Sequence, residues 1–327
     1  MTLNRRAAAA ALLLTCLSGA ALAAGNWPEK PIKLVVPFPP GGGGDNMARL
    51  VMTRVAQELG QPLVVENLAG AGGNLGSVNA ARASGDGYTL LYGTNGTFGI
   101  NQTLYRKPGF SATNDFVPVG RLTTIAAMVV VRPSMNVKTM ADLTKLFKAS
   151  PGKYTFASAG NGTTSHMAGE MLKSALGVDI VHVPYRGGAP AITDVIGGQV
   201  DTMIDVMPNT APQVKGGKLQ AIAVSTAKRV PGFDNVPTIA ESGVAGANGF
   251  DVGAWDAIFA PKGTPAEVVD KVNAAIRKVL ADPDMQAQLA SRGAVPSPST
   301  PAELRSFVAT EVDRWGKAVK QAGATID

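Results

Sequence analysis

The sequence predicts an α/β fold of doubly wound lobes with mainly parallel sheets. Five times along the chain, a short apolar segment ends in a glycine-rich loop and is followed by a helical segment. The apolar segments are continuous rather than alternating, which is typical of strands that helices cover on both faces. Strand and helix in series favour parallel pairing. The chain of 327 residues, 45% of them hydrophobic, is long enough for two such domains.

The elements can be placed in order along the chain. The five repeated units occupy residues 32–50, 63–83, 89–101, 154–172 and 180–198. In the first unit, Asp45 is a good N-cap for a helix whose apolar stripe begins at Met47. Near the C-terminus, Thr264 and Thr300 each open the sequence Thr-Pro-Ala-Glu, a capping box with proline at the first helical position. We therefore expect two more helices there, the second ending at Gly323.

The first 24 residues have the pattern of an export signal. A basic pair at residues 5–6 precedes an apolar stretch over residues 7–17 and a small-residue motif at residues 21–23. The apolar stretch is too short for a permanent membrane span. We expect cleavage after Ala23 or Ala24 by the general secretory route. Twin-arginine export and lipidation at Cys16 are the alternatives, and both motifs match less well.

Composition excludes several classes of protein. Cys16 is the only cysteine and would leave with the leader, so the mature chain would have no disulfide and no cysteine nucleophile or metal ligand. Removing Arg5 and Arg6 lowers the formal charge from +6 to +4. The remaining surplus contains no polybasic run, which argues against nucleic-acid binding. No second hydrophobic stretch is long enough for a transmembrane helix.

The chain lacks a convincing catalytic motif. It has no P-loop and no nucleophile elbow, and the glycines at residues 70–76 follow G-x-G-x-x-x-G rather than the dinucleotide fingerprint. His166 and Glu170, spaced i and i+4, could share a metal, but two ligands alone are weak support for a site. His182 lies within an apolar segment and is expected to be a structural strand residue. We therefore predict no catalytic residue, no metal and no cofactor.

The glycine-rich loops indicate a ligand site. In a parallel sheet these loops gather at the carboxyl ends of the strands, and each following helix directs its N-terminal N–H groups into the same crevice. Glycines within residues 41–44, 70–73 and 160–162 would let backbone amides approach an anion directly. We expect the closest approach at Gly42. The alternative is that the glycines serve only tight turns.

A series of motifs resembles the Bug proteins, the periplasmic solute receptors of tripartite tricarboxylate transporters. They are VVPFPPGGGGDNMAR, ENLAGAGGNLG, ASAGNGTTSHMAGEML, HVPYRGGAPAITDVIGGQVD, VPTIAESGVAG and WDAIFAPKGTPAEVVDKVNAAI, and together they cover nearly all of the mature chain. Gly44, Ala69 and Arg186 depart from the residues that are frequent in the family at these positions. These departures bear on the identity of the ligand rather than on the family.

The resemblance implies two α/β lobes of periplasmic-binding-protein type, joined by crossover strands and closing like a flytrap on a small carboxylated solute. The crossovers are expected near Val129 and Asp251. The first lobe would then be residues 25–128 and 252–327, and the second residues 129–251. The resemblance also implies a receptor rather than an enzyme, a periplasmic location, a monomer and transient contact with permease subunits in the inner membrane. A receptor that serves a sensor kinase, an exported enzyme and a nucleotide-binding protein are the alternatives.

The predicted ligand-binding residues lie in the loops that follow successive strands. They are Phe38, Pro39, Gly41, Gly42, Gly43, Asp45, Gly70, Ala71, Gly72, Gly73, Thr94, Asn95, Ser158, Ala159, Gly160, Asn161, Thr163, Tyr185, Arg186, Gly187 and Asp205. Asp45 is expected to cap a helix more than to touch an anionic solute. Asp205 could receive a ligand amine or cap a loop, and Phe38 could line the pocket or pack in the core.

Overall fold

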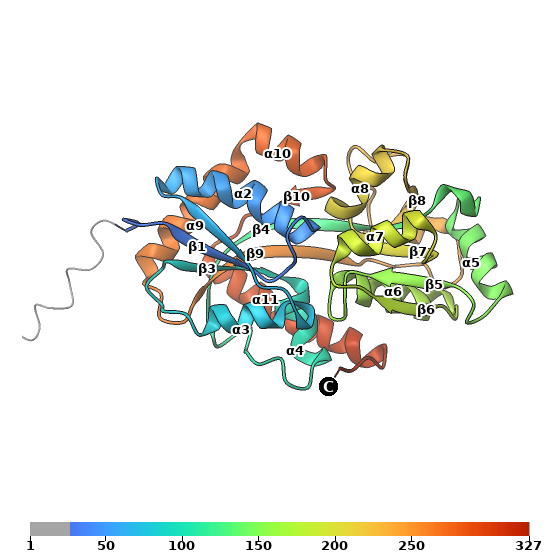
Figure 1. Cartoon of the computed structure of the whole chain (residues 1–327), viewed down its shortest axis with the longest axis horizontal. Helices are drawn as coiled ribbons and strands as arrows, with labels where there is room; N and C mark the ends of the chain where they lie inside the picture. Colours follow the sequence, from blue (N-terminus) through green and yellow to red (C-terminus); the bar gives the residue numbers. More distant parts are fainter. Residues whose placement is uncertain (1–26, 327) are drawn as a thin grey trace, which may run out of the picture.

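A computed structural model describes residues 27–326 of the chain, arranged as two lobes side by side (Figure 1). The predicted export signal, with Cys16 and the cleavage position, lies outside the described residues. Within residues 27–326, no helix combines the length and the apolar character that crossing a membrane requires.

The secondary structure alternates between strands and helices over most of the chain. The strands are β1 (Ile32–Val36), β2 (Leu63–Asn67), β3 (Thr89–Thr94), β4 (Phe116–Val131), β5 (Thr155–Ser158), β6 (Val181–Pro184), β7 (Thr202–Val206), β8 (Gln220–Val224), β9 (Gly253–Pro261) and β10 (Ala294–Pro296). The α-helices are α2 (Gly43–Leu59), α3 (Asn74–Ala81), α4 (Asn101–Leu104), α5 (Met140–Ala149), α6 (Thr164–Leu176), α7 (Gly188–Gly197), α8 (Met207–Lys215), α9 (Ala266–Ala281), α10 (Pro283–Ala290) and α11 (Pro301–Gln321). Short 3₁₀ or π turns are η1 (Ala71–Gly73), η2 (Gly96–Ile100), η3 (Pro133–Met135) and η4 (Ala240–Ser242).

The strands form one sheet that runs through both lobes in the order β2-β1-β3-β9-β4-β7-β5-β6, with β8 and β10 also paired to β4. β1 pairs in parallel with β2 and β3, and β5 pairs in parallel with β6 and β7. The pairs made by β4 and β9 are antiparallel. The predicted α/β class and the parallel units are confirmed, and the sheet as a whole is mixed.

β4 joins the two lobes, because it changes partners part-way along its length. Up to Ala126 it pairs with β9, and from Ala127 onward it pairs with β7 and β8. The chain returns to the first lobe near Val252, beside this point of β4. Ser225 forms hydrogen bonds to both crossover segments. Its hydroxyl accepts from the Ala127 N–H and donates to the Val252 carbonyl.

Each sheet face is covered by an apolar cluster. In the first lobe, α2 and α9 bury Val51 and Ile276 against Leu34 and Ile258. The opposite face holds Phe98 stacked on Phe259, with ring centroids 3.8 Å apart. In the second lobe the side chains of β4 alternate between two clusters, as a strand period of two residues requires. Full burial of one such side chain contributes about 1.5–3 kcal/mol, so these clusters fix the positions from which the loops extend.

Two predicted helix caps are wrong, and one is confirmed. Thr300 and Glu303 form the predicted capping box. The hydroxyl of Thr264 instead donates to the Pro261 carbonyl, and α9 begins after Pro265 with no side-chain cap. Gly42 is the N-cap of α2, so Asp45 lies inside the first turn. Thr264-Pro265 and Thr300-Pro301 begin the same sequence pattern, so the choice of cap depends on the tertiary contacts of each helix start and not on residue spacing alone.

Candidate functional site

A cleft between the lobes contains an inner chamber of about 90 Å³, where the N-termini of α2, α6, α7 and α8 meet. Its floor is formed by the crossover strands. The lining residues are Phe38, Pro39, Gly42, Gly43, Gly44, Met47, Tyr92, Thr94, Asn95, Gly96, Ile125, Ala159, Thr163, Thr164, Ser165, Gly187, Gly188, Asp205, Val206, Pro208, Asn209, Ala254, Trp255 and Asp256. The first turn of each of these helices leaves N–H groups without intrahelical partners, which directs partial positive charge toward this part of the cleft.

A larger vestibule of about 540 Å³ adjoins the chamber. The two spaces share five lining residues, namely Phe38, Pro39, Ala159, Thr163 and Gly187. The vestibule is lined on one side by residues 69–73 of the first lobe and on the other by residues 159–161 and 184–187 of the second. A solute held between the lobes can therefore extend from the vestibule into the chamber.

Most of the predicted site residues come together in these two spaces. Those that line the chamber are Phe38, Pro39, Gly42, Gly43, Thr94, Asn95, Ala159, Thr163, Gly187 and Asp205. Those that line only the vestibule are Gly70, Ala71, Gly72, Gly73, Gly160, Asn161, Tyr185 and Arg186. Gly41, Asp45 and Ser158 line neither space.

The three remaining predicted residues, Gly41, Asp45 and Ser158, take part in hydrogen bonds within the loops next to the cleft. Asp45 is 2% exposed, and its carboxylate accepts from the Gly41 N–H (2.9 Å), Asn67 Nδ2 (2.8 Å) and Arg49 Nε (2.9 Å). Burial acts to raise its pKa, but the three donors outweigh burial and lower it. Ser158 is buried and accepts from the Gly160 N–H. These side chains have their polar atoms occupied within the protein.

The glycines matter because the lobes approach each other closely at the cleft. A Cβ on Gly43 would lie 2.8 Å from Asn209 Oδ1, and a Cβ on Gly72 would lie 2.5 Å from the Asn161 carbonyl oxygen. In both cases the obstructing atom belongs to the other lobe. The prediction that the closest approach lies at Gly42 is wrong. The φ of Gly42 is −75°, and a Cβ there would meet only the Pro39 carbonyl oxygen, at the ordinary contact distance of 3.5 Å.

Hydrogen bonds also cross the cleft. The Tyr105 hydroxyl donates to the Asn161 carbonyl at 3.3 Å, and the Thr164 hydroxyl donates to Asn95 Oδ1 at 2.9 Å. Each bond joins a residue of the first lobe to the second lobe, either in the loop before α6 or at the first residue of that helix. Tyr105, Thr164 and Asn209 were not predicted as site residues. Tyr105 and Asn209 stand outside the quoted motifs, and only the three-dimensional fold brings them to the cleft, whereas Thr164 lies within one of the motifs, directly after the predicted Thr163.

Two buried carboxyl groups line the chamber. Asp205 is 2% exposed, and burial raises its pKa to about 7, although Asn209 Nδ2 donates to it at 2.7 Å. Asp256 accepts from the Tyr92 and Thr123 hydroxyls, both at 2.6 Å, and burial raises its pKa as well. Among the described lining residues of the chamber there is no lysine or arginine. Arg186, at the vestibule, is exposed.

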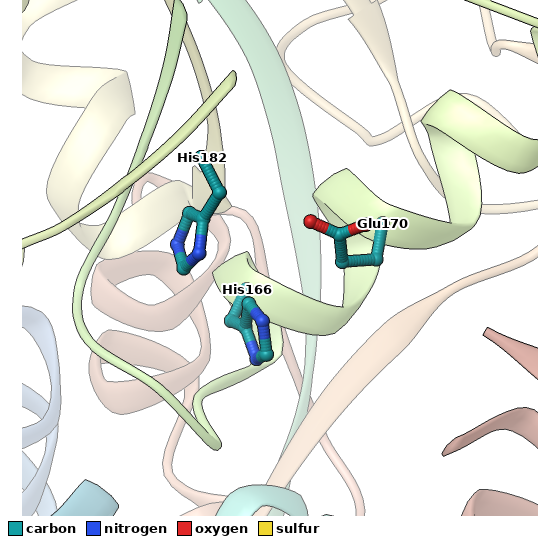
Figure 2. A group of neighbouring side chains, drawn as sticks. All are labelled: His166, Glu170 and His182. Atoms are coloured by element: carbon teal, nitrogen blue, oxygen red, sulfur yellow. The ribbon is translucent and has the colours of Figure 1, made fainter. Parts of the chain in front are cut away.

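His166 and Glu170 of α6 and His182 of β6 form a cluster (Figure 2), and both histidines bond to the loop of residues 158–163. One possible ligand atom from each lies within 4.8 Å of the others. The histidine rings are stacked, however, with centroids 4.5 Å apart and planes inclined by 24°. His166 Nδ1 accepts from the Gly162 N–H at 3.3 Å, so its other ring nitrogen carries the proton of the neutral ring. A metal would need in-plane lone pairs that converge, so the arrangement supports the loop rather than forming a metal centre.

The second histidine also holds this loop. His182 Nε2 lies 2.6 Å from Ser158 Oγ, and Ser158 in turn accepts from the Gly160 N–H. Burial is the main cause that lowers the pKa of both rings, and it brings that of His182 to about 4. Both rings are therefore neutral near pH 7, the form that the Gly162 bond requires.

The family model described as "Tripartite tricarboxylate transporter family receptor" matches residues 47–324. The chain belongs to this family. The receptor is 34% identical to Protein BugT of Bordetella pertussis over 94% of each chain. It is 38% identical to a UPF0065 protein of Pseudomonas sp. (strain P51), over 97% of this chain and 93% of the relative.

Solved structures resemble the receptor over nearly their whole length. The periplasmic binding protein BugD is 39% identical, with a TM-score of 0.86 over 91% of this chain and 99% of BugD. An R. palustris protein solved with adipate is 35% identical, with a TM-score of 0.89 over 92% and 100%. MatC from Rhodopseudomonas palustris, solved with malate, is 35% identical, with a TM-score of 0.84 over 90% and 100%.

These similarities confirm the predicted resemblance to Bug proteins and the two-lobed fold. The family consists of periplasmic solute receptors, so the receptor is not an enzyme, as the lack of catalytic motifs suggested.

The histidine pair predicts a loss of stability in acid. The native state favours neutral His182, whose pKa of about 4 lies below the value of about 6.5 in an unfolded chain. The stabilising contribution is therefore complete above pH 6.5 and is lost as the pH falls toward 4. The free energy of unfolding should fall by about 1–3 kcal/mol more over this range in the parent than in His182→Gln.

Urea titrations at closely spaced pH values measure this difference. Comparing the two proteins removes the contributions of Asp205 and Asp256, whose raised pKa values stabilise the native state in acid and so act in the opposite direction. Parallel stability profiles of parent and variant would show that His182 does not titrate in this way.

Proposed function

We propose that this receptor binds a small carboxylated solute between its lobes and delivers it to the permease of a tripartite tricarboxylate transporter. The observation that carries the proposal is the meeting of several helix N-termini at a chamber with glycine-lined walls. Two relatives of similar fold were solved with adipate and malate, which are both carboxylates. A receptor that serves a sensor kinase would use the same cleft.

Backbone amides are the proposed grip on the carboxylate. Charge-assisted hydrogen bonds contribute about 1.5–3 kcal/mol each, so several of them give useful affinity without a buried cationic side chain. Phe38, Pro39, Ala159, Thr163 and Gly187 border both spaces. We place the carboxylate at this junction, beside the glycines of both lobes. Arg186 is exposed at the rim and should add about 1 kcal/mol or less.

The lobes are proposed to close by bending at the two crossovers. The limits predicted from the sequence, residues 25–128 with 252–327 and residues 129–251, are supported by the change of partners in β4 after Ala126 and by the start of β9 at Gly253. Ser225 sits between the crossovers and would serve as the pivot. We also propose export with cleavage after Ala23 or Ala24, and a monomeric receptor.

Equilibrium binding tests the function. Purified receptor would be titrated by calorimetry with mono-, di- and tricarboxylates and aromatic acids, malate and adipate included, and with dinucleotides. We expect at least one carboxylate to bind without turnover. At a hundred times its dissociation constant that solute should raise the free energy of unfolding by about 2.7 kcal/mol. Binding of a dinucleotide but of no carboxylate, or formation of any product, would contradict the proposal.

A matched pair of glycine variants tests closure. Gly72→Ala places a Cβ against the Asn161 carbonyl across the cleft, whereas Gly60→Ala adds a Cβ to open space at the end of α2. Both glycines have positive φ (62° and 74°), so both variants carry a similar backbone cost. Gly72→Ala should weaken binding of the carboxylate at least about tenfold, and Gly60→Ala should leave the affinity near that of the parent.

Calorimetry on both variants, with circular dichroism as a control for folding, decides the outcome. Equal affinities in folded Gly72→Ala and Gly60→Ala would mean that the solute does not require the close approach of the lobes at residue 72.

A further inference from the structure

Asn95 lines the chamber and carries a buried hydrogen-bond donor that has no partner within residues 27–326. Its side chain is fully buried, and its Nδ2 has no hydrogen-bond partner. The Thr164 hydroxyl donates to the Oδ1 of the same amide across the cleft, which leaves Nδ2 as the group available to a ligand. Buried donors are nearly always paired, so this donor is a candidate to bond an oxygen atom of a solute in the chamber.

Asp205 supplies the complementary acceptor. Its carboxyl is buried in the same chamber, and its donors are Asn209 Nδ2 and the backbone N–H of Val206. A carboxylate can accept about four hydrogen bonds, so capacity remains for an N–H of the solute. The acceptor and the free donor of Asn95 therefore line one small space.

The polar groups of the chamber disfavour two other groups at this end of the solute, a second carboxylate and an ammonium group. A second carboxylate of the solute would be buried with Asp205 and Asp256, and no lysine or arginine stands among the described lining residues to offset it. An ammonium group would suit Asp205, but it has no lone pair and cannot accept from Asn95 Nδ2. An uncharged amide satisfies both, because its oxygen accepts from Asn95 and its N–H donates to Asp205.

We propose that the solute carries a carboxylate at one end and an uncharged carboxamide at the other, and that Asn95 and Asp205 recognise the amide in the chamber. This inference rests on the proposed function, which places the carboxylate between the glycine-rich loops. A chamber of about 90 Å³ has room for an amide group and little more, so the rest of the solute lies in the vestibule. Asn95 and Asp205 thus determine specificity, while the glycine-rich loops provide the general grip on the carboxylate.

Matched series of half-amides, diacids and ω-amino acids test the proposal. At each chain length from three to six carbons, calorimetry compares the half-amide with the diacid and the amino acid, for example succinamate with succinate and 4-aminobutyrate. At the best length the half-amide should bind at least about tenfold more tightly than either competitor. Tighter binding of a diacid or an amino acid would overturn the inference while leaving the proposed function intact. If no compound with a carboxylate binds, the proposed function fails, and the inference fails with it.

Two variants assign the preference to residues. Asn95→Asp removes the donor, and Asp205→Asn removes the carboxyl group whose ionised form, which predominates above its pKa of about 7, opposes a second carboxylate. Each should lower the ratio of half-amide to diacid affinity at least about tenfold. The exposed Asn235→Asp makes the same chemical change as Asn95→Asp away from both spaces and should leave the ratio unchanged.

A ratio is the appropriate readout, because a general loss of folded protein lowers both affinities together. If Asn95→Asp fails to fold, Asp205→Asn alone still decides the matter. An unchanged ratio of half-amide to diacid affinity in every folded variant would show that Asn95 and Asp205 do not distinguish an amide from a carboxylate at the far end of the solute.

Discussion

The close approach of two backbones across the cleft is the constraint on which the receptor depends. Gly43 faces Asn209, Gly72 faces the Asn161 carbonyl, and Gly162 faces Asn101, and in each case a Cβ would collide with an atom of the other lobe. Side chains are excluded there because main-chain groups of both lobes must reach a common small space. The hydrogen bonds from Tyr105 to Asn161 and from Thr164 to Asn95 are possible only at this separation.

In the proposed function, the same constraint lets an anion bind next to a chamber whose described lining holds no lysine or arginine. Helix N-termini from both lobes supply partial positive charge, while Asp205 and Asp256 keep the chamber itself unsuited to a second negative group. The loop of residues 158–163 keeps its shape through neutral histidine rings behind it. In this proposal, binding of the carboxylate, selectivity for the distal group and support of the loop come from three different groups of residues.

Much of the fold could be predicted from the sequence, because the parallel units depend on local signals. Continuous apolar runs mark β1, β3 and β5, and glycine-rich loops mark the carboxyl ends of those strands. The antiparallel role of β4 and β9 was not predictable, because pairing partners distant in sequence leave no local pattern. For the site, the loops were predictable and their detailed roles were not. The distinction between Gly42 and Gly43 depends on Asn209, more than 160 residues away in the chain.

Measuring the distance between the lobes tests the central claim most directly. Cys16 is the only cysteine, so a Cys16→Ser background accepts spin labels at introduced cysteines alone. Leu75 on α3 and Thr193 on α7 are exposed and belong to opposite lobes. Double electron–electron resonance between labels at these positions should show a shorter and narrower distance distribution when the tightest-binding carboxylate is present at saturation. An identical or longer distribution at saturation would contradict a receptor that closes on its solute.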